Sequence, residues 1–473
     1  MKKPTERIYK LSQYVEKTVL TKSPSAFAIH TYRKDLQKLV HNLIPSWASV
    51  IEFGSRSGDI LNSLPNPSKI GIEVSKGVIQ QAQKKYKNIQ FIQGDYEHIR
   101  VSKKIDYVIL TNILSFLYDT QPFIDNIRHF TYPDSRIIVI SFNFLWKPLL
   151  DVAADLNLRT QAPFEVNWLS SYDIQNLFYL EGYELVKKQS RMLLPVEIPI
   201  LSWVINTFLA KLPGFQSLCL TQVLVFKPLP KPKEYSVSII IPARNEEGNI
   251  PKLLDRIPRM GTSTEVIFVE GHSKDNTYQS IQEELRRYKG HMKAYLYKQT
   301  GIGKRNAVEY ALKKVNNELV IILDADLTVD PSELPKFYNA IAQGKGDLII
   351  GSRLIYPMEK QAMRFLNYLG NKFFSMAFTF LVGQTIKDTL CGTKAFLLST
   401  YKDIERNREQ FGDFDPFGDF DLIFGASKLN LKITEIPTRY KERSYGTSNI
   451  SRFTHGILLF KMTLIAAKKI KFI

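Results

Sequence analysis

The sequence predicts an α/β protein with two domains, each built on a mainly parallel β-sheet with helices packed on it. Three observations support this prediction. The chain has 473 residues, which is enough for two or three domains. Prolines and lysines crowd together in KPLPKPKEY (227–235), which favours a stiff linker there. On each side of it, short β-rich apolar runs alternate with longer helical patterns, as in parallel sheets.

The composition indicates a globular protein with an anionic partner. Hydrophobic residues make up 44% and aromatic residues 12% of the chain, which excludes a disordered protein. The net charge of +18 suggests nucleic acid, phospholipid or a phosphorylated substrate. No nucleic-acid recognition motif accompanies this charge, so we do not expect a nucleic-acid partner. Two cysteines, Cys219 and Cys391, fit a reducing compartment, and MKKPTERIYK lacks the apolar core of a signal peptide.

The first half predicts five strands, a helical stretch and a closing hairpin. We expect the strands in SVIEFGSRSGDIL (49–61), KIGIEVS (69–75), IQFIQGD (89–95), IDYVILTNIL (105–114) and SRIIVISFN (135–143). The hairpin is expected from YELVKKQ (183–189) and CLTQVLVFKP (219–228). A glycine turn follows the first strand, and acidic residues lie at the ends of the next two.

This order resembles the class I S-adenosylmethionine-dependent methyltransferases over roughly residues 30–228. The resemblance implies an acid and a glycine turn at the methionine part of the cofactor, an acid at the ribose hydroxyls and an Asp at the adenine. The matching residues are Glu52, Gly54, Gly58, Glu73 and Asp95. The middle glycine of the family's turn is Arg56 here, a side chain where backbone should approach the ligand. The alternative is a domain kept for structure or partner binding.

Polar residues follow the expected strands of the second half. The stretches YSVSIIIPARNEEGNI (235–250), EVIFVEGHSKDNT (265–277) and DLIIGSRL (347–354) each read as a strand that runs into a polar loop. KQTGIGKRNAVEYAL (298–312) is a glycine-basic loop entering a helix whose N-terminal amides can hold phosphate. In LVIILDADLTVDP (319–331), five apolar residues end in Asp324 and Asp326. Ligands bind at strand ends on one edge of such sheets, so we expect one shared site.

Asp324 and Asp326 predict a divalent metal site. At a strand-to-loop break both carboxylates can turn toward one cation. Mg²⁺ or Mn²⁺ takes one or two carboxylates and completes its coordination with phosphate oxygens and water. A nucleoside-diphosphate sugar needs this arrangement, because the metal neutralises the diphosphate leaving group. A lone D-x-D motif occurs often by chance, but here four other strand-end signals accompany it.

The second half resembles glycosyltransferase family 2, with the GT-A fold, over roughly residues 235–450 and most closely the polyprenyl-phosphate sugar transferases. The segments that carry the resemblance are IIIPARNEEGNI, FVEGHSKDNT, LDADLTVDP, IIGSRL, IKDTLCGTKAF (386–396) and ITEIPTRYKERSYGTSNI (433–450). It implies that the nucleotide-sugar site is lined by Pro242, Arg244, Glu246, Glu270, Asp275, Lys304, Asp324 and Ser448. It also implies that Arg353 and Arg364 face the acceptor phosphate and that Arg443 closes over the donor phosphates.

Two classes of acceptor remain open at this point. A phosphate is already an anion and attacks without a base, but it needs arginines to hold it, and Arg353, Arg364 and Arg443 suit that role. A sugar or protein hydroxyl needs a carboxylate base. The candidate bases are Asp413, Asp415, Asp419 and Asp421 in FGDFDPFGDFDLIF (411–424), and Asp388. The histidines His272, His291 and His455 are expected to be ordinary surface or packing residues.

Two stretches favour attachment to a membrane surface. No segment reaches the ~18 uncharged apolar residues that span a bilayer. However, MRFLNYLGNKFFSMAFTFLVG (363–383) and GILLFKMTLIAAKKIKFI (456–473) mix apolar and basic residues, as helices lying on anionic membranes do. Residues 428–473 hold ten lysines or arginines against two glutamates.

We therefore expect two Rossmann-like α/β domains, a class I methyltransferase fold followed by a GT-A glycosyltransferase fold. The expected boundaries are 1–29 for a basic segment, 30–228 for the first domain, 229–234 for the linker, 235–455 for the second domain and 456–473 for a basic amphipathic helix.

The expected function is an inverting, Mg²⁺- or Mn²⁺-dependent transfer of sugar from a UDP- or GDP-sugar to a membrane-associated acceptor, first of all polyprenyl phosphate. The protein is expected on the cytoplasmic face of an anionic membrane, with S-adenosylmethionine as the cofactor of the first domain. The alternatives are methyl transfer as the main activity, transfer to a glycan hydroxyl with an Asp base, and a non-enzymatic membrane scaffold.

Overall fold

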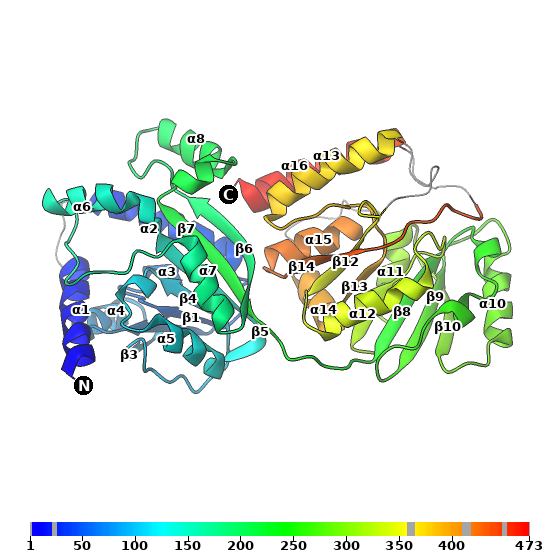
Figure 1. Ribbon diagram of the computed structural model, residues 1–473, viewed down its shortest axis with the longest axis horizontal. Coiled ribbons are helices and arrows are strands. Elements are labelled where there is room, and N and C mark those ends of the chain that lie inside the picture. The colour runs from blue at the N-terminus through cyan, green and yellow to red at the C-terminus, as the bar shows by residue number, and fades with distance from the viewer. Residues whose placement is uncertain (1, 21–25, 357–364, 409–417, 447–451, 473) are drawn as a thin grey trace. The chain divides into compact units, whose positions relative to one another are not determined.

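The computed structural model describes residues 2–20, 26–356, 365–408, 418–446 and 452–472. The described chain divides into two compact units, with the break after Pro230 (Figure 1). Unit 1 contains Met1–Pro230 and unit 2 contains Lys231–Lys471. Each unit is an α/β domain with one seven-stranded mixed sheet, so the predicted fold class is confirmed.

The sheet of unit 1 has the order β3-β2-β1-β4-β5-β7-β6. Its strands are β1 (Val50–Phe53), β2 (Lys69–Glu73), β3 (Gln90–Gln93), β4 (Ile105–Thr111), β5 (Thr131–Phe142), β6 (Tyr183–Arg191) and β7 (Thr221–Pro228). The strands from β3 to β5 are parallel, and β7 runs antiparallel between β5 and β6. This is the closing hairpin that the sequence predicts.

Helices cover both faces of this sheet (Figure 1). Two separate apolar clusters lie between the helices and the sheet. The α-helices are α1 (Lys2–Leu20), α2 (Ala26–Leu43), α3 (Asp59–Asn62), α4 (Lys76–Lys85), α5 (Thr120–Ile127), α6 (Lys147–Asp155), α7 (Ser171–Leu180) and α8 (Leu201–Thr207). All four residues of β1 are buried, as expected for a strand covered on both faces. One of these four buried residues is the acidic residue Glu52.

The sheet of unit 2 has the order β10-β9-β8-β11-β13-β12-β14. Its strands are β8 (Val237–Ala243), β9 (Thr264–Glu270), β10 (Lys293–Lys298), β11 (Leu319–Ile322), β12 (Leu348–Ser352), β13 (Lys394–Leu397) and β14 (Ile433–Pro437). Strand β13 runs antiparallel between β11 and β12, a feature that the sequence did not predict. The central strands β9, β8 and β11 are parallel, so their carboxyl ends share one edge.

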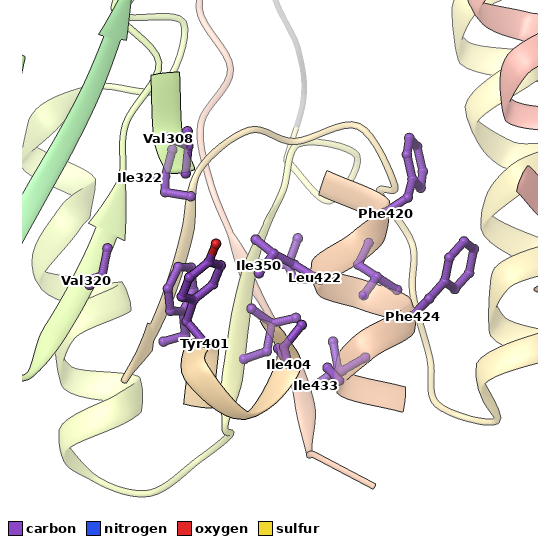
Figure 2. Packing of buried hydrophobic residues seen from close by; sticks show 14 of the residues in the cluster. Val308, Val320, Ile322, Ile350, Tyr401, Ile404, Phe420, Leu422, Phe424 and Ile433 are labelled. Atoms are coloured by element: carbon purple, nitrogen blue, oxygen red, sulfur yellow. The ribbon is translucent and has the colours of Figure 1, made fainter. Parts of the chain in front are cut away.

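The α-helices of unit 2 are α9 (Leu253–Arg256), α10 (Thr277–Arg287), α11 (Lys304–Leu312), α12 (Leu334–Ala342), α13 (Phe365–Val382), α14 (Leu398–Arg406), α15 (Asp419–Lys428) and α16 (Arg452–Ala466). Figure 2 shows how α15 enters the core, with Phe420, Leu422 and Phe424 among the buried side chains beside Ile350 and Ile404. This packing anchors the first turn of α15, where Asp419 and Asp421 lie.

Helices α13 and α16 pack side by side (Figure 1). Each buries one apolar face, which includes Phe378 on α13 and Met462 on α16. Within the described ranges, neither these helices nor any other is long and apolar enough to cross a bilayer.

Candidate active site

Three neighbouring strands of unit 2 deliver polar side chains to one edge of the sheet. Strand β8 leads into Arg244 and Glu246, β9 ends in Glu270, and β11 leads into Asp324 and Asp326. The strand order β9-β8-β11 makes these ends adjacent. Ligands of open α/β sheets bind at this edge, so it is the candidate active site.

Arg443 joins two of the acidic residues. Its Nη2 donates to Asp326 Oδ2 at 2.6 Å and its Nη1 to Glu246 Oε1 at 3.2 Å. Asn249 Nδ2 donates to the other oxygen of Glu246 at 2.6 Å. Thr328 donates to Asp326 Oδ1 from its backbone N–H at 3.1 Å and its hydroxyl at 2.8 Å. Both carboxylates are thus held in one orientation on the same side of the site.

Backbone pairing explains how Arg443 reaches this edge from so late in the chain. Val329, just after the D-x-D motif, forms a β-bridge with Tyr440. Lys441 N–H donates to the carbonyl of Thr328 at 3.0 Å. The segment after β14 therefore lies along the loop after β11, and Arg443 follows within three residues.

Asp324, the other acidic residue of the D-x-D motif, forms an ion pair with Lys304. Lys304 is the first residue of α11, and its Nζ lies 2.6 Å from Asp324 Oδ1. Gly392 approaches this pair so closely that a Cβ atom there would collide with Asp324 Oδ2 and Lys304 Nζ. A side chain at position 392 would therefore force Asp324 and Lys304 to move. Gly392 precedes β13, in the CGTK sequence.

Burial and neighbouring charges shift the pKa values of two carboxylates at this edge in opposite directions. Burial raises the pKa of Glu246 to about 7; Asn249 and Arg443 oppose the rise, while Asp326 and Asp324 add to it. Burial alone would raise the pKa of Asp324, but the Lys304 ammonium group outweighs it and holds that pKa below its ordinary value.

Asp324 and Asp326 provide two carboxylates for a metal ion. The described part of the chain holds no group of three or more His, Cys, Asp or Glu side chains arranged to bind one. Two carboxylates suit an oxygen-seeking ion such as Mg²⁺ or Mn²⁺, which completes its coordination with phosphate oxygens and water. This donor set fits the predicted metal.

The other expected nucleotide-site residues lie along the same edge. Glu270 is buried and accepts from the N–H of Ser273 at 2.5 Å. Asp275 accepts from the N–H groups of Thr277 at 3.1 Å and of Glu247 at 3.3 Å. Burial would raise the pKa of Asp275, but hydrogen bonds from Thr277 lower it. Pro242 lies in β8, and Arg244 is exposed.

Arg353 is brought together with Asp388. The guanidinium donates from Nε at 2.6 Å and from Nη2 at 2.8 Å, and the backbone N–H of Arg353 donates at 3.0 Å. Asn371 Nδ2 adds a bond to Asp388 at 2.9 Å, and Asp388 is fully buried. Burial would raise the pKa of Asp388, but Arg353 brings it to about 2. A carboxylate this acidic and enclosed is poorly suited to accept a proton as a base.

The acids at the start of α15 also face cations. Lys394 is fully buried, and its Nζ donates to Asp419 Oδ1 and to the carbonyl of Cys391, both at 2.6 Å. Asp421 Oδ2 lies 3.3 Å from Arg305 Nη2 and 3.6 Å from Arg408 Nε. Lys394, the first residue of β13, was not expected from sequence; the signal was its place at the end of the CGTK sequence. The residues Arg364, Asp413, Asp415 and Ser448 lie outside the described residues.

In unit 1 the expected cofactor residues lie at the carboxyl ends of β1, β2 and β3. Gly54 and Gly58 have φ values of 75° and 78°, and a Cβ on Gly54 would lie 2.6 Å from Ile113 Cγ2. Glu52 is buried and accepts from Thr111 Oγ1 at 2.8 Å. Burial raises the pKa of Glu52 to about 8, which leaves it protonated at neutral pH.

Glu73 is fully buried, and both oxygens of its carboxylate accept hydrogen bonds from within unit 1. Its Oε1 accepts from the hydroxyl of Tyr96 at 2.8 Å and the N–H of Val74 at 2.7 Å, and its Oε2 accepts from the N–H of Arg56 at 3.0 Å. Asp95 accepts from the N–H of Glu97 at 3.1 Å. These residues do not fit S-adenosylmethionine as they stand, because the carboxylate meant for the ribose hydroxyls is enclosed.

The fold and the site of unit 2 define a GT-A glycosyltransferase. Residues 238–404 match the model of glycosyl transferase family 2, and residues 46–180 match that of a methyltransferase domain. The chain belongs to glycosyl transferase family 2 through its second half, and its first half carries a methyltransferase domain. Both resemblances seen in the sequence are thereby confirmed.

Known relatives match about half of the chain. The dolichyl-phosphate hexose transferase of Haloferax volcanii is 30% identical over 226 residues, which are 48% of this chain and 91% of that protein. Glycosyltransferase AglJ of the same organism is 29% identical over 231 residues, 48% of this chain and 71% of its own length. For two other relatives, the hexosyltransferase Agl6 of Haloferax volcanii and the undecaprenyl-phosphate 4-deoxy-4-formamido-L-arabinose transferase of Edwardsiella ictaluri, the chain spans only 54% and 62% of their length.

Among solved structures, the glucosyl-3-phosphoglycerate synthase of Mycobacterium tuberculosis is similar. It is 16% identical, with a TM-score of 0.37, and the match covers 50% of this chain and 81% of that one.

Proposed function

We propose that this protein transfers a sugar, with inversion, from a UDP- or GDP-sugar to a polyprenyl phosphate, with Mg²⁺ or Mn²⁺ bound at Asp324 and Asp326. The observation that carries the proposal is the meeting of Asp324, Asp326, Lys304 and Arg443 at the carboxyl edge of the sheet. Two carboxylates for a cation and two cations for phosphates suit a nucleoside diphosphate as leaving group.

The donor side follows from these residues. A Mg²⁺ or Mn²⁺ ion would offset the charge that develops on the diphosphate. Lys304 and Arg443 provide charge-assisted donors for phosphate oxygens, which bind about twice as strongly as neutral donors. Glu246, with its pKa raised to about 7, also contacts Arg443, so its protonation state would adjust how much of that positive charge the donor meets.

The acceptor side favours a phosphate. A hydroxyl acceptor needs a carboxylate that can take its proton. Asp388 is held by Arg353, Asp419 by Lys394, and Asp421 by Arg305 and Arg408. A phosphate oxygen attacks without such a base, and the Haloferax volcanii relative is named for a dolichyl-phosphate acceptor.

The roles of the two predicted acceptor arginines differ in this proposal. Arg353 uses its guanidinium on Asp388, so we assign it the task of positioning the loop that carries Asp388 and Cys391. Arg364, outside the described residues, remains the proposed contact for the acceptor phosphate.

Helices α13 and α16 support attachment to a membrane surface. On α13 the exposed apolar residues are Leu369, Phe373 and Met376, spaced by four and three residues. On α16 they are Ile457, Phe460 and Leu464, again at helical spacing. Exposed lysines on and beyond α16 include Lys461, Lys468 and Lys469. An apolar stripe with basic neighbours suits an anionic bilayer surface, which we propose is the cytoplasmic face.

The test is release of nucleoside diphosphate from a panel of UDP- and GDP-sugars with Mg²⁺ or Mn²⁺. It compares assays with and without undecaprenyl phosphate in detergent, and the native protein with Asp326→Ala. The control is Glu318→Gln, at an exposed ion pair with Lys233. Lipid-dependent release that only Asp326→Ala abolishes supports the proposal. Donor binding without release for any lipid would instead indicate a hydroxyl acceptor.

A further inference from the structure

Unit 1 carries a side chain in the space that its family resemblance reserves for a ligand. Tyr96 is only 3% exposed, and its hydroxyl bonds Glu73 Oε1 at 2.8 Å. The same oxygen of Tyr96 lies 3.9 Å from the position of a Cβ on Gly54. The phenol therefore fills the gap between the glycine turn after β1 and the carboxylate at the end of β2.

The carboxylate of Glu73 offers no exposed surface to a ligand. Its exposed fraction is zero, and both oxygens accept bonds from within unit 1. A ribose with two neighbouring hydroxyls would have to replace the Tyr96 hydroxyl and the N–H of Arg56. The exchange would leave the buried Tyr96 hydroxyl and the Arg56 N–H without their acceptor, which is unfavourable.

Arg56 supplies a positive charge to the same place. Burial raises the pKa of Glu52 and of Glu73, and the Arg56 charge opposes both shifts. It also opposes the rise that burial causes in the pKa of Tyr32, on α2. The charge of a cationic cofactor would meet Arg56 there, and like charges repel at short range.

Helix α1 covers the adjoining strand ends. Leu11, Tyr14 and Val15 are buried in the cluster that contains Tyr96. Arg7 donates from Nε to the carbonyl of Phe116 at 3.1 Å and from Nη2 to that of Leu117 at 3.0 Å, after β4.

The space that remains beside Asp95 is small. The cavity between α1 and the strand ends, lined by Arg7, Leu11, Asp95 and Tyr96 among others, has a volume of about 20 Å³. That is room for about one water molecule.

We propose that unit 1 is a methyltransferase fold whose cofactor cleft is filled by its own chain. Tyr96 and the Arg56 N–H take the place of ligand hydroxyls on Glu73, Arg56 takes the place of the ligand's positive charge, and α1 closes the edge. Unit 1 therefore binds no S-adenosylmethionine and transfers no methyl group. This inference does not depend on the function proposed for unit 2.

The test is calorimetric titration of the full chain with S-adenosylmethionine and S-adenosylhomocysteine, with thermal unfolding recorded in parallel. We expect no heat of binding and no rise in Tm at ~1 mM ligand, where a cofactor with a Kd of about 10 µM would stabilise the fold measurably. Binding of either compound at one per chain, or entry of labelled methyl groups into any product, would overturn the proposal.

A second measurement tests the role of Tyr96 directly. Tyr96→Phe keeps the ring and removes the hydroxyl, so Glu73 loses a buried donor and the Tm should fall by several degrees. The matched control is Tyr118→Phe, because Tyr118 is exposed near the same edge and should leave the Tm unchanged. A Tyr96→Phe protein as stable as the native one would contradict the filled-cleft proposal.

Discussion

Arg443 Nη2 lies 2.6 Å from Asp326 Oδ2, although the two residues are 117 positions apart in the chain. The same guanidinium also reaches Glu246 at 3.2 Å. Arg443 thus connects the polar loop after β8 with the D-x-D loop after β11. The position of the late segment that carries Arg443 therefore sets the charge around Asp326.

Arg443→Lys should lower kcat/KM for sugar transfer by roughly 10- to 100-fold, because charge-assisted bonds contribute about 1.5–3 kcal/mol each. Lysine keeps the charge but loses the fork that reaches Asp326 and Glu246 together. Steady-state kinetics with Arg439→Lys, an exposed neighbour, provides the control. Equal activity of Arg443→Lys and the native protein would exclude the bridging role.

Gly392→Ala should reduce transfer at least ~10-fold while the protein stays folded. The added Cβ would collide with Asp324 and Lys304 and push that ion pair apart. Nucleotide binding and Tm are measured together with activity. Gly370→Ala is the matched control, since a Cβ on Gly370 meets nothing within 4 Å. An unaffected Gly392→Ala enzyme would show that this close approach is unimportant.

Asp388→Asn should destabilise unit 2 by roughly 3–5 kcal/mol, because it leaves Arg353 buried without its counter-charge. Denaturant unfolding measures the loss, with Glu318→Gln as an exposed control expected near 0–1 kcal/mol. If Asp388 is instead a general base, the variant will keep its stability and lose activity alone. The two roles are therefore separated by one pair of measurements.

Glu52 should make unit 1 less stable as the pH rises. Its folded pKa is raised from 4.5 to about 8, so between these values the folded unit keeps a proton that the unfolded chain releases. The free energy of unfolding then falls by ~1 kcal/mol per pH unit in this window. Glu52→Gln should flatten the dependence of Tm on pH between 5 and 8. Parallel profiles for the two proteins would rule out a buried neutral Glu52.

Phe373→Asp and Phe460→Asp should each weaken sedimentation with anionic vesicles, because both exposed rings lie on the apolar stripes of α13 and α16. Added salt should weaken binding further by screening the nearby lysines. The control is Tyr295→Ser, on strand β10 at the edge of the unit 2 sheet, away from the two apolar stripes. Vesicle binding that survives both Asp variants would place the membrane contact elsewhere.

Local patterns in the sequence were sufficient to predict most strands and the position of the D-x-D motif. A buried strand needs a continuous apolar run, and a strand end at a binding edge needs polar residues, so both leave a signal within ten residues. The antiparallel strand β13 left no such signal. Its four residues carry no mark of direction, which is set by pairing with β11 and β12.

The sequence by itself determined the two α/β domains, most of their strands and which carboxylates stand at strand ends; the order of the strands in each sheet came from the tertiary structure. Only the tertiary structure decided the partner of each charged group: Asp388 for Arg353, Lys394 for Asp419, Tyr96 for Glu73. These pairs join residues 23 to 35 positions apart, and the strength of an ion pair or hydrogen bond depends on distance and burial that only folding establishes. For that reason Asp388, a candidate base in the sequence, is a buried, ion-paired carboxylate in the structure, and Glu73, a candidate cofactor ligand, is buried and hydrogen-bonded to Tyr96.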